Sequence, residues 1–286
     1  MPLFPDRSVP THTVDLHCHS TRSDGLLAPR EVVARAAARG IRVLALTDHD
    51  DVGGLDEAHA AARAVGLEFV SGVEISVTWN DRTLHVVGLH VDPQHPRLRE
   101  GLRAIRAGRH CRAERIAKGL EEAGIAGSLE GARAFVTNPD LVGRTHFARY
   151  LVQQGRGRDV HAVFRKYLTA GKPGYVPHRW ASLEQAVGWI NASGGVAVLA
   201  HPGRYGLQPS ERDCLLEQFI GAGGEAIEVI TGSHAPDAYA LWAGCARRYG
   251  MLASVGSDFH DPGEGRRDFG VLPVLPGGVK PVWERF

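Results

Sequence analysis

IRVLALTDHD, residues 41–50, decides the fold of this 286-residue chain, because an apolar run leads directly into side chains of the metal-ligand type. Short runs rich in β-branched and other apolar residues are typical of buried strands. Further clusters of histidine and carboxylate occur in the same setting: DLHCHSTRSDG (15–25), GVEIS (72–76), LHVVG (84–88), AHP (200–202) and GSDFH (256–260). We therefore expect each cluster to lie where a buried parallel strand leaves its sheet, so that all of them converge on one rim.

Nine side chains of these clusters are candidate metal ligands: His17, His19, Asp24, His49, Glu74, His85, His201, Asp258 and His260. Imidazole and carboxylate without paired cysteines suit manganese, iron or zinc in hydrolytic chemistry better than a closed structural zinc site. One ion cannot use nine ligands, so the set predicts two or three divalent ions. Any one of these residues could be a helix cap or a core histidine satisfied by backbone. Nine such groups buried together without cations would be very costly.

The pattern along the chain alternates between strands and helices in two blocks. From residue 13 to about 92 it reads strand, helix, strand, helix, strand, strand, and the alternation resumes near residue 182. Such alternation predicts parallel βα units, and a complete or incomplete barrel brings ligands from many strand ends to one face. We predict an α/β barrel formed by residues 1–95 and 177–286. Residues 96–176, where one helical pattern follows another, are expected to be an inserted helical cap, called the cap below.

The composition is that of an ordinary globular protein. The formal net charge of +1 excludes the global basic excess of a dedicated nucleic-acid coat, so any anion binding must be local. The start, MPLFPDRSVPTHT, contains no apolar h-region and no run approaches membrane-spanning length, so we expect a cytoplasmic protein without membrane contact. The four cysteines stand singly, which indicates neither a disulfide framework nor a CxxC metal site. Strand alternation predicts that Cys18, between His17 and His19, faces the core.

Arginine or lysine recurs in the cap at residues 103, 106, 109, 112, 115 and 118. A three-residue step drifts by about 60° per repeat around a helix of 3.6 residues per turn, so these cations do not form a single basic face. One interpretation is a solvated helix on which the cations pair with Glu100, Glu114, Glu121 and Glu122. The other is that a subset of them contacts phosphate.

Seven residues in the cap, at its border or on the barrel rim are candidate substrate contacts: Arg144, His146, Lys172, Tyr175, His178, Arg204 and His234. Arginine recognises phosphate through paired hydrogen bonds, and a helix N-terminus adds oriented N–H groups. Each of these residues alone could also be an ordinary surface or rim residue. Asp48 and Asp50 flank His49, and we expect them to support ligating histidines through hydrogen bonds or to act as capping groups.

In order and spacing, the six clusters resemble the polymerase and histidinol phosphatase (PHP) superfamily. With the inserted helical segment they are similar to its branch of nucleoside 3',5'-bisphosphate phosphatases and 5'-to-3' exoribonucleases. The resemblance runs from about residue 13 to 265 and implies a PHP-type distorted (βα)7 barrel with an inserted small helical cap domain. It implies three ion sites, the first held by His17, His19, Glu74 and Asp258, the second by Asp24, His49 and His260, and the third by Glu74, His85 and His201. Glu74 would bridge ions, and Asp24, where some relatives carry histidine, favours manganese over iron or zinc.

The resemblance also implies an activity, a metal-dependent phosphoesterase that cleaves at the phosphorus attached to the 3' oxygen of a nucleotide bearing a 5'-phosphate. A hydroxide bridging two metal ions would attack in line, with Glu74, His201 and Asp258 as catalytic residues. The implied substrates are nucleoside 3',5'-bisphosphates or short 5'-phosphorylated RNA, and the sequence indicates no obligate protein partner. The alternatives are a histidinol-phosphate phosphatase, with the same rim and a different cap, and a non-catalytic nucleic-acid-binding module. A vestigial site would have lost ligands, whereas every ligand position here is occupied.

Overall fold

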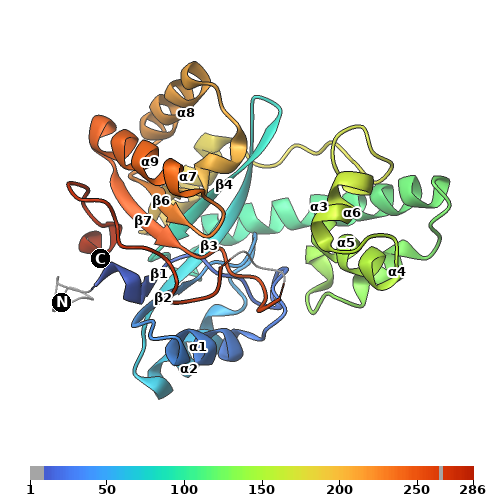
Figure 1. The fold of residues 1–286 in the computed structure, drawn as a ribbon, viewed down its shortest axis with the longest axis horizontal. Coiled ribbons are helices and arrows are strands. Elements are labelled where there is room, and N and C mark those ends of the chain that lie inside the picture. Colours follow the sequence, from blue (N-terminus) through green and yellow to red (C-terminus); the bar gives the residue numbers. More distant parts are fainter. Residues whose placement is uncertain (1–9, 264–266) are drawn as a thin grey trace.

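A sheet of seven strands forms the centre of the molecule in the computed structural model, which describes residues 10–263 and 267–286 (Figure 1). The strands lie in chain order: β1 Val14–Asp15, β2 Val43–Leu46, β3 Glu68–Trp79, β4 Arg82–Leu89, β5 Val196–Leu199, β6 Ala226–Thr231 and β7 Leu252–Gly256. Residues 1–9, which make up most of the start predicted to lack an h-region, lie outside the described residues.

Six of these strands run in one direction and β4 runs against them. β1, β2 and β3 pair in parallel, β4 is antiparallel to β3 and to β5, and β5, β6 and β7 pair in parallel. The two ends of the sheet meet, because the N–H of Leu16 donates to the carbonyl of Val255 and the N–H of Asp258 to the carbonyl of His17, both at 2.9 Å. The sheet is therefore a nearly closed barrel, which confirms the predicted fold class.

The direction of β4 differs from the sequence prediction, which placed every ligand cluster at the carboxyl end of a parallel strand. That prediction is wrong for His85. Asn80 and Asp81 form a two-residue turn with φ of 45° and 57°, the left-handed conformation that Asn and Asp adopt more readily than most residues. The turn reverses the chain, so β4 begins on the side where the parallel strands end, and His85 pairs with Ser76 of β3.

Helices cover the outside of the barrel, namely α1 Pro29–Ala38, α2 Leu55–Val65, α7 Leu183–Ala192, α8 Pro209–Gly221 and α9 Pro236–Tyr249. Their apolar side chains and those of the strands form two clusters, the smaller one beneath α1 and α2. Cys18 is fully buried in that smaller cluster, where its Sγ donates to the carbonyl of Ala45 at 3.2 Å, so the prediction that it faces the core is confirmed. None of the described helices combines the length and apolarity needed to cross a bilayer.

The cap lies to one side of the barrel (right in Figure 1), and all of its regular secondary structure is helical. Leu98 and Leu102 of its first helix pack in the barrel core, whereas Ile116 and Leu120 of the same helix pack in a separate cap core. At Gly101 an added Cβ would lie 2.4 Å from the ring of Trp189, so glycine permits the close approach of this helix to α7. The elements are α3 Pro96–Glu122, α4 Ser128–Arg133, a 3-10 turn at Pro139–Leu141, α5 Arg144–Gln153, α6 Val160–Val163 and a π-helical turn at Phe164–Leu168.

Candidate metal centre and its flanking cavities

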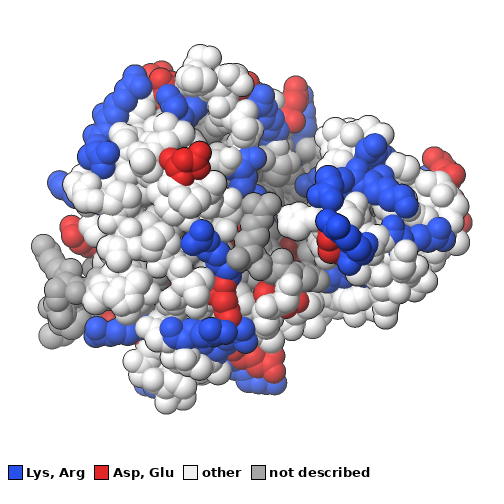
Figure 2. All heavy atoms as spheres, viewed as in Figure 1, with Lys and Arg blue, Asp and Glu red and all other residues white. Residues whose placement is uncertain are grey.

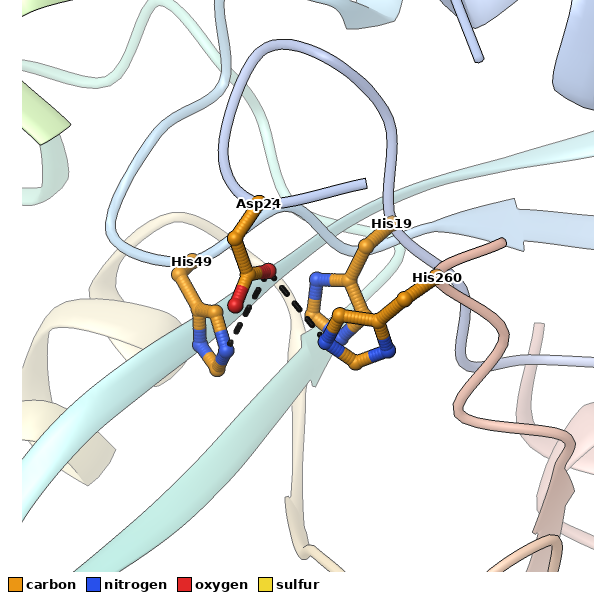
Figure 3. A group of neighbouring side chains, drawn as sticks. All are labelled: His19, Asp24, His49 and His260. Carbon is orange, nitrogen blue, oxygen red and sulfur yellow. Dashed lines mark ion pairs between the residues drawn. The ribbon is translucent and has the colours of Figure 1, made fainter. Parts of the chain in front are cut away.

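The nine predicted ligands come together at one end of the barrel. His17, His19 and Asp24 follow β1, His49 follows β2, Glu74 lies in β3, His85 lies in β4, His201 follows β5, and Asp258 and His260 follow β7. Figure 3 shows four of them, His19, Asp24, His49 and His260, pointing toward one another. Every one of the nine belongs to at least one group of three or four residues whose donor atoms lie within 4.8 Å of one another.

Glu74 is fully buried at the centre of this cluster, and its two carboxylate oxygens face different histidines. Oε1 lies 2.9 Å from Nδ1 of His85, 2.9 Å from Nε2 of His201 and 3.3 Å from Nε2 of His17. Oε2 lies 2.8 Å from Nδ1 of His49 and 3.3 Å from Nε2 of His19. A carboxylate whose two oxygens face different sets of ligands is placed to bridge neighbouring cations.

Several nitrogen and oxygen atoms of these side chains are buried and have no hydrogen-bond partner in the described part of the chain. They are Nε2 of His17 and of His19, Nδ1 of His49 and of His201, Oδ1 of Asp24 and Oε2 of Glu74. Such atoms are costly to bury alone. Two ligands bound at right angles, each at about 2.1 Å from one ion, are about 3 Å apart. The distances from the Glu74 oxygens to the histidine nitrogens match that spacing. The residues therefore fit a cluster of divalent ions.

The surroundings act on the ligating histidines in opposite directions. For His17, His49 and His260 burial alone would lower the pKa, but nearby carboxylates raise it, to about 9 for His260. Two other histidines are held in the neutral form that a metal ligand needs. Burial lowers the pKa of His19 to about 3, helped by His260 and His49, and burial lowers the pKa of His85 to about 4. Both imidazoles are therefore neutral at pH 7, with a free lone pair. Burial alone would raise the pKa of Glu74, but the neighbouring His85, His49 and His17 hold it well below its ordinary value. Glu74 is therefore ionised and can offer both oxygens.

Glu228, which the sequence analysis did not single out, supports two of the ligands from the middle of β6. Its Oε1 lies 2.7 Å from the ring nitrogen Nδ1 of His17, and its Oε2 accepts a hydrogen bond from the backbone N–H of His201. A ligating histidine that donates its other ring nitrogen to a carboxylate has a fixed orientation and tautomer. The available signal was an acidic residue inside the apolar run AIEVIT, because such a residue, when buried, must have a partner.

Asp48 and Asp50 support the centre through hydrogen bonds rather than by ligation. Asp48 accepts from the N–H of Ser20 at 2.8 Å and from the hydroxyl of Ser23 at 2.6 Å, which fixes the loop that carries His19 and Asp24. Asp50 accepts from the N–H of Ser76 at 2.7 Å. The structure thus places both beside the site in the supporting position that the sequence predicted, although neither accepts from a ligating histidine.

Arginines of α3 tie the cap to the barrel. Arg106 donates to the carbonyl of Asp50 at 2.7 Å, and Nε of Arg109 donates to the Asp50 carboxylate at 3.1 Å. Glu114 was one of the partners expected for these cations, but it lies instead beside His110, with 3.3 Å between its Oε1 and Nε2 of the histidine. On the face shown in Figure 2, Lys and Arg lie in separate groups with Asp and Glu between them, so no continuous basic surface covers it.

Four of the seven candidate substrate contacts, Arg144, Tyr175, His178 and Arg204, line a cavity of about 610 Å³ between the cap and the barrel. We call it the arginine cavity. Arg112 of α3 also lines it, and Arg112, Arg144 and Arg204 line the metal centre as well. The arginine cavity is therefore continuous with the centre.

The other three candidates lie elsewhere. His146 lines the metal centre but is fully buried, with Nδ1 accepting from the N–H of Gly143 at 3.0 Å and Nε2 lying 3.2 Å from the carbonyl of Ser23. His234 is buried as well, and its Nε2 accepts from the N–H of Gly203 at 2.9 Å. Lys172 is exposed in a turn and is not among the residues that line the arginine cavity or the metal centre.

Two cations of the arginine cavity lack an acidic partner among the described residues. Arg112 donates to the carbonyl of Val176 and Arg144 to the carbonyl of Leu168, and their other contacts are with the faces of aromatic rings. Burial, together with the neighbouring Arg144 and Arg109, lowers the pKa of Arg112 to about 9. Like charges buried side by side without a counter-charge are unfavourable, so the cavity is suited to bind an anion.

The comparisons with known proteins show the family of this chain. Residues 15–196 match the family model described as the PHP domain, which is more than half of the chain, and the chain belongs to this family. Its fold and its curated relatives are those of hydrolases, and the cluster of histidine, glutamate and aspartate is able to bind metal ions.

Two curated relatives and one solved structure are similar over nearly the whole chain. The 3',5'-nucleoside bisphosphate phosphatase of Chromobacterium violaceum is 54% identical over 94% of this chain and 95% of the relative. The 5'-3' exoribonuclease of Haemophilus influenzae is 42% identical over 96% of this chain and 100% of the relative. The structure of an amidohydrolase from Chromobacterium violaceum, with bound sulfate and no metal, has a TM-score of 0.93 and 53% identity, and the match covers 96% of this chain and 95% of that one.

Proposed function

We propose that this protein hydrolyses the 3'-phosphate or 3'-phosphodiester of nucleotides that carry a 5'-phosphate, using two or three divalent ions. The relatives named above act on nucleoside bisphosphates or on RNA from its 5' end, and both substrates share this chemistry. In the proposed reaction the bond between phosphorus and the 3' oxygen breaks with either substrate. One centre can serve both.

The observation that carries the proposal is the arginine cavity next to the metal centre. Arg112 and Arg144 have no acidic partner among the described residues, and a second phosphate bound in the arginine cavity would supply the counter-charge. Arginine is suited to a terminal phosphate because its planar group donates two parallel hydrogen bonds. The solved relative with bound sulfate supports binding of a tetrahedral oxyanion by this family.

Divalent ions at the centre would lower the pKa of a water molecule and stabilise charge on the phosphoryl oxygens. His17, His19, Asp24, His49, Glu74, His85, His201, Asp258 and His260 would hold them. The chain's own cations complete the site, because Arg204 donates to Oδ2 of Asp258 at 3.0 Å and lines the cavities on both sides of it. From the cap, the hydroxyl of Thr145 donates to Oδ2 of Asp24 at 2.9 Å and fixes that carboxylate.

The resident metal proposed is manganese, with iron and zinc as the alternatives. Carboxylate oxygens from Asp24, Glu74 and Asp258 alongside imidazoles form a mixed set that suits manganese. The proposed compartment is the cytoplasm, which is reducing, and Cys18, Cys111, Cys214 and Cys245 are all free.

A substrate panel with manganese tests the proposed function. Adenosine 3',5'-bisphosphate and a 5'-phosphorylated oligoribonucleotide should be turned over with much higher kcat/KM than adenosine 3'-monophosphate, which lacks the 5' anion. Histidinol phosphate should be a poor substrate. If histidinol phosphate or adenosine 3'-monophosphate is preferred, the proposed role of the arginine cavity is wrong.

Arg144→Met should lower kcat/KM on 5'-phosphorylated substrates by roughly 10- to 100-fold. The lost charge-assisted hydrogen bond is worth about 1.5 to 3 kcal/mol, and the methionine fills most of the space that the arginine occupied. Analogues with a 5'-hydroxyl should lose little. Lys172→Met, at a cation outside the cavity, is the matched control and should leave both substrates nearly unchanged. An equal loss on the two substrates in Arg144→Met would show that Arg144 serves the reacting phosphate or the fold.

A further inference from the structure

A further cavity, of about 460 Å³, is lined by Asp258 and His260 and shares Arg204 with the arginine cavity. We call it the distal cavity. Its lining includes Thr145, Arg149, His161 and Ser233, and residues from both the cap and the barrel contribute to it. Pockets that hold small organic ligands have volumes of about 300 to 1,000 Å³, so the distal cavity is large enough for a nucleoside.

The two cavities and the metal centre are continuous. The centre shares Arg112, Arg144 and Arg204 with the arginine cavity. It shares Thr145, Arg204, Asp258 and His260 with the distal cavity. A phosphate bound at the centre would therefore have a cavity on each of two sides. A nucleoside 3',5'-bisphosphate ends at the reacting phosphate and would occupy only one of them.

We propose that the distal cavity holds the nucleoside that follows the scissile phosphate in an RNA chain, an inference that rests on the function proposed above. This assignment requires more positive charge in the cavity that binds the terminal phosphate than in the cavity that binds the nucleoside, and the linings of the two cavities differ in that way. Five arginines line the arginine cavity, which suits a terminal phosphate with up to two negative charges: Arg82, Arg112, Arg144, Arg179 and Arg204. The distal cavity has buried Arg149, the exposed His161 and the shared Arg204, together with Val160 and the backbone of Gly203 and Gly232. Such a lining suits a nucleoside and a phosphodiester, which has a single charge.

The oxygen of water bonds to phosphorus, the bond from phosphorus to the 3' oxygen of the first nucleotide breaks, and that oxygen takes a proton. The products are a nucleoside 5'-monophosphate and an RNA that is shorter by one nucleotide and has a new 5'-phosphate. That 5'-phosphate is the group that the arginine cavity binds, so the product is again a substrate. The distal cavity would thus hold the part of an RNA substrate that a nucleoside 3',5'-bisphosphate lacks.

His161→Glu tests this inference by putting a negative charge in the distal cavity. Like charges repel, so kcat/KM on the 5'-phosphorylated dinucleotide pApA should fall by roughly tenfold or more. On adenosine 3',5'-bisphosphate, which leaves that cavity empty, the fall should be about twofold at most. Ser233→Tyr, which fills the cavity without adding charge, should show the same selectivity. His12→Glu makes the same change at an exposed histidine outside the cavity and should affect neither substrate.

The outcomes separate the inference from the proposed function. If the wild-type protein turns over neither substrate, the proposed function fails. If it turns over the bisphosphate but not pApA, or if His161→Glu and Ser233→Tyr leave the ratio of the two activities unchanged while their thermal unfolding matches that of the wild type, the inference is overturned and the function stands. Selective loss on pApA in both variants supports the distal cavity as the site of the second nucleotide.

Discussion

Replacing Glu74 by glutamine is expected to lower turnover by roughly a thousandfold or more and to reduce the amount of bound metal. One oxygen of Glu74 faces His85 and His201 and the other faces His49 and His19, so Glu74 would hold ions bound by these histidines and offset their charge. A neutral amide of the same shape would leave the cations repelling one another at short range. It would also weaken the stabilisation of the charge that builds up in the transition state.

The measurements are kcat on the bisphosphate and metal content by elemental analysis after dialysis. Glu68→Gln is the matched control, since it makes the same change at the start of the same strand, away from the cluster, and should retain both metal and turnover. Wild-type turnover in Glu74→Gln would mean that Glu74 does not bridge ions and that the multinuclear assignment is wrong.

Glu228→Gln is expected to weaken metal binding by about 10- to 100-fold, although Glu228 is not itself a proposed ligand. Loss of a carboxylate that supports a ligating histidine has this effect in other metal sites. Glu228 contacts the ring of His17 and the backbone N–H of His201, so the change would loosen two ligands at once.

Titration of the metal-free variant with manganese, followed by calorimetry, measures this effect. Glu225→Gln is the control, at the residue that directly precedes β6. The carboxylate of Glu225 pairs with Arg285 at the surface and does not contact the centre. If Glu228→Gln binds manganese as tightly as the wild-type protein, Glu228 has no part in orienting His17, and the supporting role assigned to it must be abandoned.

The nine candidate ligands could be predicted from sequence because each lies within a few residues of a short apolar strand. The local pattern therefore fixes where the side chain leaves the sheet, and barrel closure then brings the strand ends together. His85 lies in the cluster, but not for the reason that the sequence pattern suggested. The turn at Asn80 and Asp81 reverses its strand, and the dipeptide Asn-Asp between two apolar runs was the signal that would have shown this.

Contacts that depend on how elements pack could not be predicted in the same way. Helical periodicity shows which residues share a side of α3, but it does not show which side meets the barrel, so Arg112 was not distinguished from the other cap cations. Glu228 lies inside an otherwise apolar strand, and its role depends on His17 from the opposite end of the sheet coming next to it. Similarly, Lys172 and Arg144 look alike in sequence, and only the packed cap shows that one is exposed and the other lines the cavity.

The most direct test of the central claim is the identity of the products formed from adenosine 3',5'-bisphosphate by the manganese-loaded protein, followed by phosphorus NMR. Hydrolysis at the 3' position, with the 5'-phosphate held in the arginine cavity, predicts adenosine 5'-monophosphate and inorganic phosphate in equal amounts. Addition of a chelator should stop their formation, and manganese should restore it. Adenosine 3'-monophosphate as the product, or turnover that persists without divalent ions, would contradict the account.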